Sequence, residues 1–189
     1  PWLFMMGTFV SAGELLSSPV VNFAKNFTSR YDIPMSQFLA ENSDLILKLI
    51  VAVGLGMLIG AERLFVHKEA GMKTHALVSL GSALFVVVSE MLAIKYGGSA
   101  GFDPTRIASQ VIVGIGFLGA GSIMLQGSRL KGLTTAGGLW VTAGIGLAAG
   151  FGFFGLALVA TILVLMIFML LNIIEKPIRK ISDQIDPER

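Results

Sequence analysis

The side chains able to do chemistry in this chain are few, and they fall into two sets. Carboxylate oxygens are the ligands that Mg²⁺ prefers, so Glu90 and Asp103 are weak candidates for a cation site, although the nearby Arg106 would oppose a divalent ion. Glu62 and His75 could exchange a proton, but no nucleophile lies at a suitable spacing, and we expect neither enzyme activity nor a cofactor. The first set is Glu90, Asp103, Arg106 and Gln110. The second set is Glu62, Arg63, Lys73, Thr74, His75, Gln126, Thr134, Thr135 and Trp140.

The elements that position these side chains are predicted from a long stretch that is almost free of charge. Between residues 104 and 174 the chain has no Asp or Glu, and its only basic residues there are Arg106, Arg129 and Lys131. A soluble domain needs more charge on its surface, so the pattern predicts an integral membrane protein. The chain has no cysteine, which excludes disulfides and thiolate metal sites. Apolar segments of spanning length predict an all-α bundle of about five transmembrane helices, at residues 45–61, 76–94, 107–126, 133–150 and 151–174.

The distribution of Lys and Arg predicts the orientation of these segments. Basic residues are most frequent after the first segment, after the third and at the C-terminus, so the positive-inside rule places the C-terminus in the cytoplasm. The second set then lies near the inner surface and the first set near the outer surface, with no carboxylate between them. We expect residues 1–44 to form an interfacial or periplasmic segment with a short helix; a sixth span is the alternative. Residues 175–189 are expected to form a cytoplasmic tail.

Helical periodicity gives three segments one polar or small face, which we expect to point into the bundle. We also expect Glu90 to pair with Arg106 across two helices and Lys48 to extend its amine toward water. The three faces comprise His75, Ser79, Ser82, Ser89 and Glu90, then Arg106, Ser109, Gln110, Ala120 and Gly121, then Thr134, Thr135, Gly138, Thr142 and Ala149.

The glycines of the apolar segments predict helix packing rather than nucleotide binding. Residues 114–119 match the dinucleotide pattern GxGxxG, but no acidic residue follows at the spacing that a ribose requires. In lipid, glycine allows helices to approach closely, so we expect a tight bundle, contacts with other membrane proteins and a homo-oligomer, and no nucleic-acid partner. The expected packing glycines are Gly56, Gly60, Gly114, Gly116, Gly119, Gly121, Gly146 and Gly150.

Several ordered strings of the sequence resemble the MgtC/SapB family of bacterial inner-membrane proteins. Their residues are Ile59-Gly60-Ala61-Glu62-Arg63, then Ala70-Gly71-Met72-Lys73-Thr74-His75-Ala76-Leu77-Val78, then Asp103-Pro104-Thr105-Arg106-Ile107-Ala108, then residues 114–121 and 131–140. The resemblance covers about residues 45–174. Lys73 stands where the family usually has Arg, and Gly137 where it usually has Ala. No soluble C-terminal domain follows the last segment, so we expect a short form of the family.

The resemblance implies a protein of the bacterial cytoplasmic membrane that is linked to growth at low Mg²⁺ and, in pathogens, to virulence. It further implies a regulator that acts through partner membrane proteins. The alternative is a permease for Mg²⁺ or another ion, which a water-filled path lined by Ser82, Ser122 and Thr142 would favour. The resemblance assigns functional positions to Glu62, Arg63, Thr74, His75, Asp103, Arg106, Thr134, Thr135 and Trp140.

Overall fold

The computed structural model describes residues 34–96, 103, 105–127 and 129–185 of the chain. The chain divides into two compact units, Pro1–Ser43 and Asp44–Arg189. In the first unit the described element is the short helix α3 (Met35–Glu41), in which Gln37 donates a hydrogen bond to Glu41. A short helix was expected at this place in the sequence; most of residues 1–44, including the expected interfacial or periplasmic segment, lie outside the described residues.

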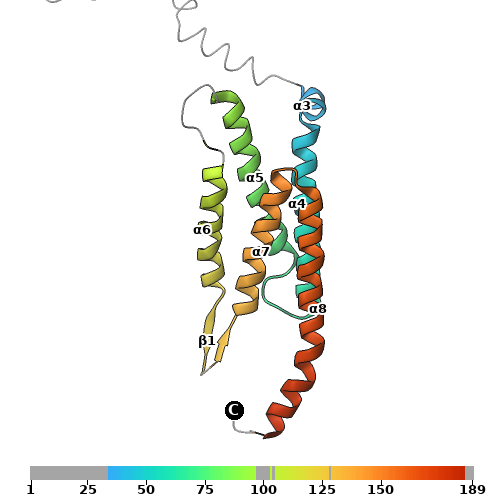
Figure 1. The fold of residues 1–189 in the computed structure, drawn as a ribbon, viewed down its shortest axis with the longest axis vertical. Helices are drawn as coiled ribbons and strands as arrows, with labels where there is room; N and C mark the ends of the chain where they lie inside the picture. Colours follow the sequence, from blue (N-terminus) through green and yellow to red (C-terminus); the bar gives the residue numbers. More distant parts are fainter. Residues whose placement is uncertain (1–33, 97–102, 104, 128, 186–189) are drawn as a thin grey trace, which may run out of the picture. The chain divides into compact units, whose positions relative to one another are not determined.

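The second unit is a bundle of five helices with one β-hairpin (Figure 1). Four of the helices are long and apolar enough to cross a membrane, and α6 is a shorter apolar helix. This confirms the predicted helical membrane bundle. The elements are α4 (Ser43–Phe65), α5 (Met72–Tyr96), α6 (Thr105–Gly121), β1 (Met124–Gln126), β2 (Arg129–Lys131), α7 (Leu133–Gly150) and α8 (Phe154–Ile185).

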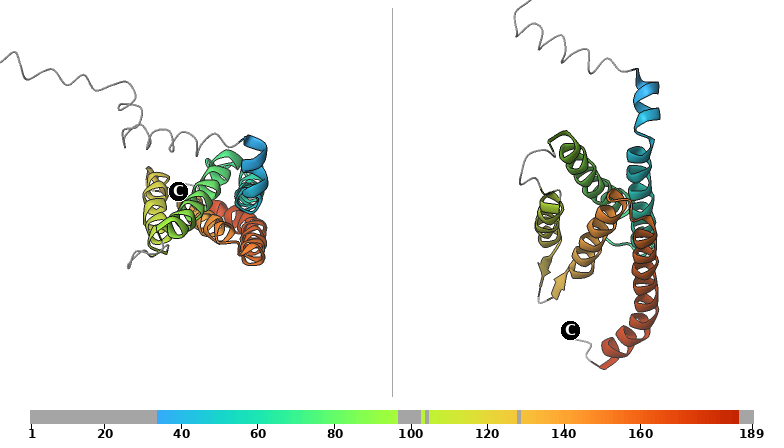
Figure 2. Two further views of the ribbon diagram at one scale, coloured as in Figure 1. Left: turned by 90° about the horizontal axis from the view of Figure 1, so that it is seen from above. Right: turned by 45° about the horizontal axis from the view of Figure 1, so that its top comes forward.

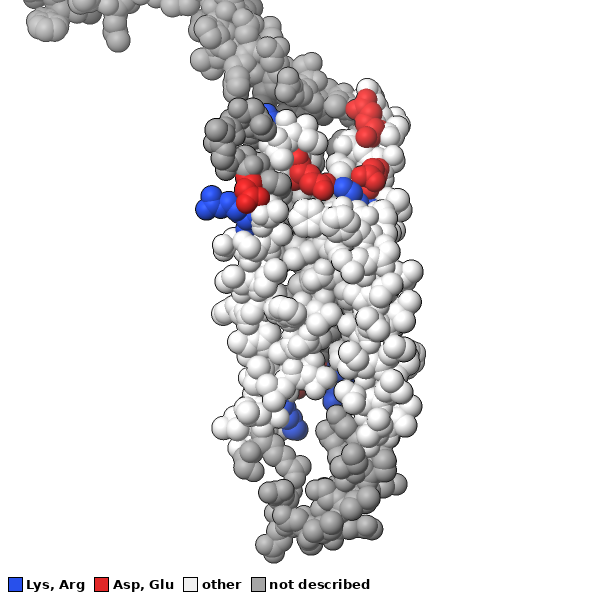
Figure 3. All heavy atoms as spheres, in the orientation of Figure 1, with Lys and Arg blue, Asp and Glu red and all other residues white. Residues whose placement is uncertain are grey.

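The surface of the bundle agrees with a membrane location. Figure 3 shows the charged side chains of one face gathered toward two ends, with a wide uncharged surface over the helices between them. Large apolar side chains of the bundle, such as Phe117 and Leu156, are more than half exposed. Lipid tails solvate such side chains, so their exposure is the expected state of spanning helices.

The core lies between α4, α5, α7 and α8. Most of its buried apolar residues are small or β-branched, as at Ala52, Ala83, Ile145 and Ala157, which allows the helix axes to approach. Glycine brings the backbones closer still. A Cβ on Gly56 would lie 2.6 Å from the carbonyl oxygen of His75 on α5, and one on Gly146 would overlap the backbone of Ser79. A Cβ would also lie 2.5 Å from the Met72 Cα at Gly60 and 2.8 Å from the Val86 Cβ at Gly150.

Helix α6 lies at one edge of the bundle, as the end-on view in Figure 2 shows. It packs against α7 and α5. Its buried residues are Ile115 and Gly119, where a Cβ on Gly119 would make ordinary contact with Ala136 at 3.6 Å. A Cβ on Gly114, Gly116 or Gly121 would meet no atom within 4 Å. The expectation that these three glycines pack closely is therefore wrong for contacts within the described chain, because no neighbouring element comes within contact distance of these positions.

The predicted third span of residues 107–126 is too long, because α6 ends at Gly121. Strands β1 and β2 follow and pair antiparallel, with Met124 opposite Lys131. Gln126 thus lies on an exposed strand and not on a helix. A short apolar run such as residues 123–125 fits a strand as well as a helix, which explains the error. The hairpin ends at Gly132, whose φ of 92° suits glycine and where a Cβ would overlap the carbonyl of Ser122.

Helices α7 and α8 form the predicted tight hairpin. Gly152 takes a φ of 79° in the turn, and the amide of Phe153 bonds to the carbonyl oxygen of Ala148 at 2.8 Å. Helix α8 then continues to Ile185, beyond the predicted end of the last span at residue 174. The segment predicted as a tail is therefore helical as far as Ile185.

Candidate functional site

A buried ion pair at the end of α4 is the centre of the candidate site. The side chains of Glu62 and Arg63 are 6% and 1% exposed, and Arg63 Nε donates to Glu62 Oε2. The second carboxylate oxygen accepts a hydrogen bond of 3.0 Å from Asn172 Nδ2 on α8. Burying two charges is costly unless both are paired and hydrogen-bonded, so this arrangement ties α4 to α8 at one defined position.

Phe168 and His75 complete this group. The Arg63 guanidinium carbon lies 3.5 Å from the centre of the Phe168 ring, a cation–π contact. A Cβ on Gly138 of α7 would lie 3.3 Å from Phe168 Cζ and 3.5 Å from His75 Nε2, so glycine leaves room for both rings. We call Glu62, Arg63, His75, Phe168 and Asn172 the inner polar cluster.

His75 is fully buried, and the hydrogen bond of its ring fixes its tautomer. Nδ1 lies 3.0 Å from the carbonyl oxygen of Gly71, which can only accept, so Nδ1 carries the proton and the neutral ring has a bare Nε2. Within the described part of the chain, His75 Nε2, Arg63 Nη2 and Ser79 Oγ have no hydrogen-bond partner. Buried polar atoms without partners are uncommon in folded proteins, so these three atoms are the ones that could take a further hydrogen bond.

The structure brings together only part of the second set predicted from the sequence. Glu62, Arg63 and His75 meet in the inner polar cluster. Thr135 is buried, and with Thr74 it lines a separate cavity of about 390 Å³ between α5, α6 and α7. The remaining members are exposed, namely Lys73, Thr74, Thr134 and Trp140 on helices and Gln126 on β1.

At the other end of the bundle, Lys48 is the centre of a second charged group. Its side chain is 10% exposed, and its Nζ lies 2.8 Å from Glu90 Oε2 and 3.5 Å from Asp44 Oδ2. The predicted pair between Glu90 and Arg106 is therefore wrong, and so is the expectation that Lys48 extends into water. Both errors have one cause, since Lys48 reaches its carboxylate across the packed interface of α4 and α5.

Asp103 begins α6 as an N-terminal cap. Its Oδ1 accepts hydrogen bonds from the Thr105 hydroxyl at 2.7 Å and the Thr105 amide at 2.9 Å. These hydrogen bonds, with a smaller contribution from the charge of Arg106, lower the pKa of the exposed Asp103 carboxyl. Glu90 and Asp103 are thus engaged by different partners. Among the residues that the structure describes, no three His, Asp or Glu side chains lie close enough to hold a metal ion.

The predicted polar faces are mostly buried on α5 and α7, where the exceptions are the half-buried Glu90 and the exposed Thr134, but not on α6. His75, Ser79, Ser82 and Ser89 are buried, as are Thr135, Gly138, Thr142 and Ala149. The predicted face of α6 is exposed along its length, at Arg106, Ser109, Gln110, Ala120 and Gly121. The expectation for α6 is wrong, because periodicity identifies a face of a helix but not what covers it.

Comparison with known proteins identifies the family. The model of the MgtC family matches residues 49–177, which is more than half of the chain. The chain belongs to the MgtC family. The matched segment contains the whole inner polar cluster. It also contains Glu90 of the Lys48 group, whereas Asp44 and Lys48 themselves precede it.

Named relatives within this family are similar to the chain over most of its length. The "Putative magnesium transporter YhiD" of Escherichia coli K12 is 43% identical over 136 residues, which cover 67% of this chain and 61% of that protein. "Protein MgtC" of Salmonella typhimurium is 46% identical over 127 residues, 67% of this chain and 52% of that protein. The chain therefore spans little more than half the length of these relatives. No solved structure matches it.

The sequence of this MgtC-family chain did not identify Asn172 and Phe168 as site residues, and it placed the amine of Lys48 wrongly. The only polar side chains in the apolar run 151–174 are those of Thr161 and Asn172. A lone amide in such a run is a signal for a buried partner, and Asn172 indeed bonds Glu62. Phe168 gives no such signal, since it lies one turn before Asn172 among other apolar residues. Lys48 could have been found from its place inside an apolar segment.

Proposed function

We propose that this chain is a non-enzymatic protein of the bacterial cytoplasmic membrane, with its C-terminus in the cytoplasm, that regulates Mg²⁺ homeostasis through contacts with other membrane proteins. Membership of the MgtC family supports the link to Mg²⁺, as does the name of the relative "Putative magnesium transporter YhiD". The inner polar cluster would hold the bundle in the shape that a partner recognises.

The observation that carries this proposal is the uncovered face of the edge helix α6. Ser109, Val113, Gly116 and Ala120 follow one another at intervals of four, three and four residues, so they lie along one side of the helix. All four are exposed, and a Cβ on Gly116 would meet no atom within 4 Å. Small residues at such spacing allow a second helix to approach closely in lipid, where packing drives association.

The packing of the bundle core also favours the proposal of a regulator over the alternative of an ion permease. The three hydroxyls expected to line a path each donate to a backbone carbonyl three or four residues earlier in the chain, Ser82 to Val78, Ser122 to Gly119 and Thr142 to Gly138. Hydroxyls bonded in this way have less capacity left to replace the water around an ion. In addition, Gly146 of α7 lies directly against the backbone of Ser79 on α5, which leaves no room for an ion at that contact.

The second candidate is a permease for Mg²⁺ or another ion, acting alone or as an oligomer. The printed name of the Escherichia coli relative favours it. The two candidates differ in one measurable property, since a permease moves Mg²⁺ through a purified bilayer and a regulator needs its partner.

The experiment that tests the proposal is the Gly116→Leu variant in cells grown at low Mg²⁺. Leucine at this position points away from the other helices of the chain, so we expect the variant to accumulate and melt like the wild type. We expect growth at low Mg²⁺ to fail, because the branched side chain separates α6 from its partner. Gly54→Leu on α4 is the matched control, since Gly54 is also exposed with no atom within 4 Å of its Cβ position. Normal growth of the Gly116→Leu strain would contradict the proposal.

A further inference from the structure

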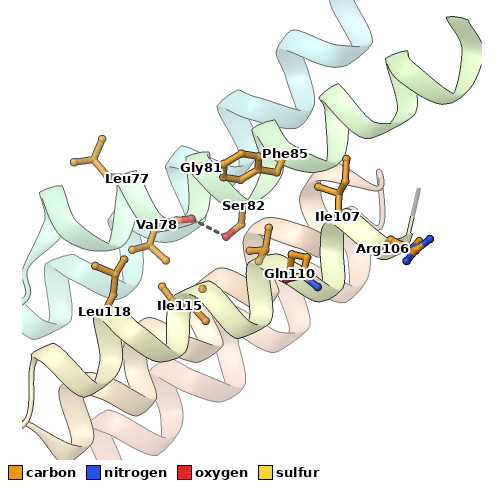
Figure 4. Close-up of a pocket in the computed structure, with 12 residues that line it drawn as sticks. Leu77, Val78, Gly81, Ser82, Phe85, Arg106, Ile107, Gln110, Ile115 and Leu118 are labelled. Carbon is orange, nitrogen blue, oxygen red and sulfur yellow. Dashed lines mark hydrogen bonds between the residues drawn. The ribbon is translucent and has the colours of Figure 1, made fainter. Parts of the chain in front are cut away.

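A groove of about 660 Å³ runs between α5 and α6 (Figure 4). Its walls are hydrocarbon along most of their length, from Val78 and Phe85 on α5 to Ile107, Ile115 and Leu118 on α6. The one hydroxyl in the wall belongs to Ser82, and it donates to the Val78 carbonyl at 2.9 Å. The body of the groove therefore offers dispersion contacts and almost no polar ones.

One end of the groove differs from the rest. Arg106 and Gln110, from the first turns of α6, line the groove beside Ile107 (Figure 4). Both side chains are exposed. A described charge near Arg106 is the Asp103 carboxylate, whose Oδ1 is already engaged by Thr105. A guanidinium and an amide thus stand at the mouth of an apolar groove, at the end of the bundle that holds the Lys48 group.

We propose that this groove binds one acyl chain of an anionic phospholipid, with the lipid phosphate on Arg106 and an ester carbonyl on Gln110. Arginine pairs with phosphate through two parallel hydrogen bonds, and the amide of Gln110 can donate to an ester oxygen. The volume lies within the ~300–1,000 Å³ typical of small-molecule sites. A transmembrane helix is a poorer occupant. A helix is a cylinder of ~10 Å diameter, so the groove has room for less than about two of its turns. This lipid site is separate from the α6 face formed by Ser109, Val113, Gly116 and Ala120.

The test is lipid binding to the purified full chain, measured by native mass spectrometry in detergent. The probes are phosphatidylglycerol and phosphatidylcholine with identical acyl chains. We expect wild type to prefer phosphatidylglycerol by about fivefold, the effect of one basic side chain near an anionic surface. Arg106→Gln should remove the preference, and Arg106→Lys should keep most of it. Gly81→Leu should weaken binding of both lipids, because Gly81 lines the groove and has no atom within 4 Å of its Cβ position.

The same spectra contain the control and the contradicting outcomes. Gly54→Leu places an equal side chain on another exposed surface and should bind both lipids like the wild type. An unchanged preference in Arg106→Gln would overturn the headgroup assignment, and unchanged binding in Gly81→Leu would overturn the groove assignment. A changed oligomer mass in Gly81→Leu, with lipid binding unaltered, would show that a helix of a second copy occupies the groove and would also overturn the proposal.

Discussion

Helices α6 and α7 are both rich in glycine, yet the bundle uses their glycines in opposite ways. On α7, a Cβ on Gly146 or Gly150 would collide with α5, and one on Gly138 would press on Phe168. On α6, Gly114 and Gly116 face open space. The same residue type thus closes an interface inside the chain on the covered side of α7 and leaves a surface free on α6, while Gly137 and Gly144 lie on the open side of α7.

The difference follows from the place of each helix in the bundle. Helix α7 packs against α5, α6 and α8, so most of its circumference is covered. Helix α6 packs chiefly against α7 and α5, and most of its described residues are exposed. A glycine pattern therefore indicates a capacity for close approach, and the fold decides whether the chain itself or a partner uses it.

The largest effect is expected for Gly146→Leu. The new side chain would overlap the backbone of Ser79, so α5 and α7 could not close, and we expect little folded protein in the membrane. Yield and size-exclusion profile after detergent extraction measure this. Gly144→Leu lies two residues away in open space and should fold normally. Equal profiles for the two variants would contradict the assignment of Gly146 to a covered side of α7 and of Gly144 to a free side.

A smaller but still large effect is expected for Glu62→Ala in the packed part of the bundle. The change leaves the Arg63 charge buried without its partner, which costs roughly 3–5 kcal/mol in comparable sites. Thermal unfolding in detergent should show a strongly lowered midpoint. Glu69→Ala, at an exposed carboxylate, should melt like wild type. If both variants melted alike, the inner polar cluster would have no part in stability.

Two adjacent glycines of α7 should respond to alanine with opposite signs. Gly138→Ala presses a methyl group toward Phe168 Cζ and His75 Nε2, and overpacking of this kind costs about 1–3 kcal/mol. Gly137→Ala adds its methyl group in open space and gains up to about 1 kcal/mol of helix propensity. The two melting midpoints, compared with wild type, measure the difference directly. Destabilisation by both would mean that the Gly137 side of α7 is also covered.

The smallest effect is expected on the free side, at the cap of α6. Hydrogen bonds from Thr105 lower the pKa of Asp103 in the folded state, so this carboxylate stabilises the helix above the ordinary carboxyl pKa. That contribution is lost as the pH falls through the lowered folded value. Asn caps nearly as well as Asp, so Asp103→Asn should melt like wild type near neutral pH and lose this acid dependence. Melting curves across acidic pH test this, and identical acid dependence in both proteins would contradict it.

The sequence alone predicted most of the bundle because lipid imposes strong rules on composition. Apolar length located all five helices, and periodicity identified the buried polar faces of α5 and α7, including His75 and Thr142. It failed where the answer depends on distant segments. The partner of Glu90 is Lys48, 42 residues earlier in the chain, and the partner of Glu62 is Asn172, 110 residues later. Spacing along one helix carries no information about such pairs, nor about which face of α6 remains uncovered.

The central claim is that this chain acts through the free face of α6 and does not itself move Mg²⁺. The most direct measurement is Mg²⁺ influx into liposomes that contain the purified protein and a trapped fluorescent indicator, with wild type and Gly116→Leu side by side. We expect influx no faster than in empty liposomes for both proteins, while only the wild type supports growth at low Mg²⁺. Influx that rises with the amount of wild-type protein in the liposomes would contradict the account and establish a permease.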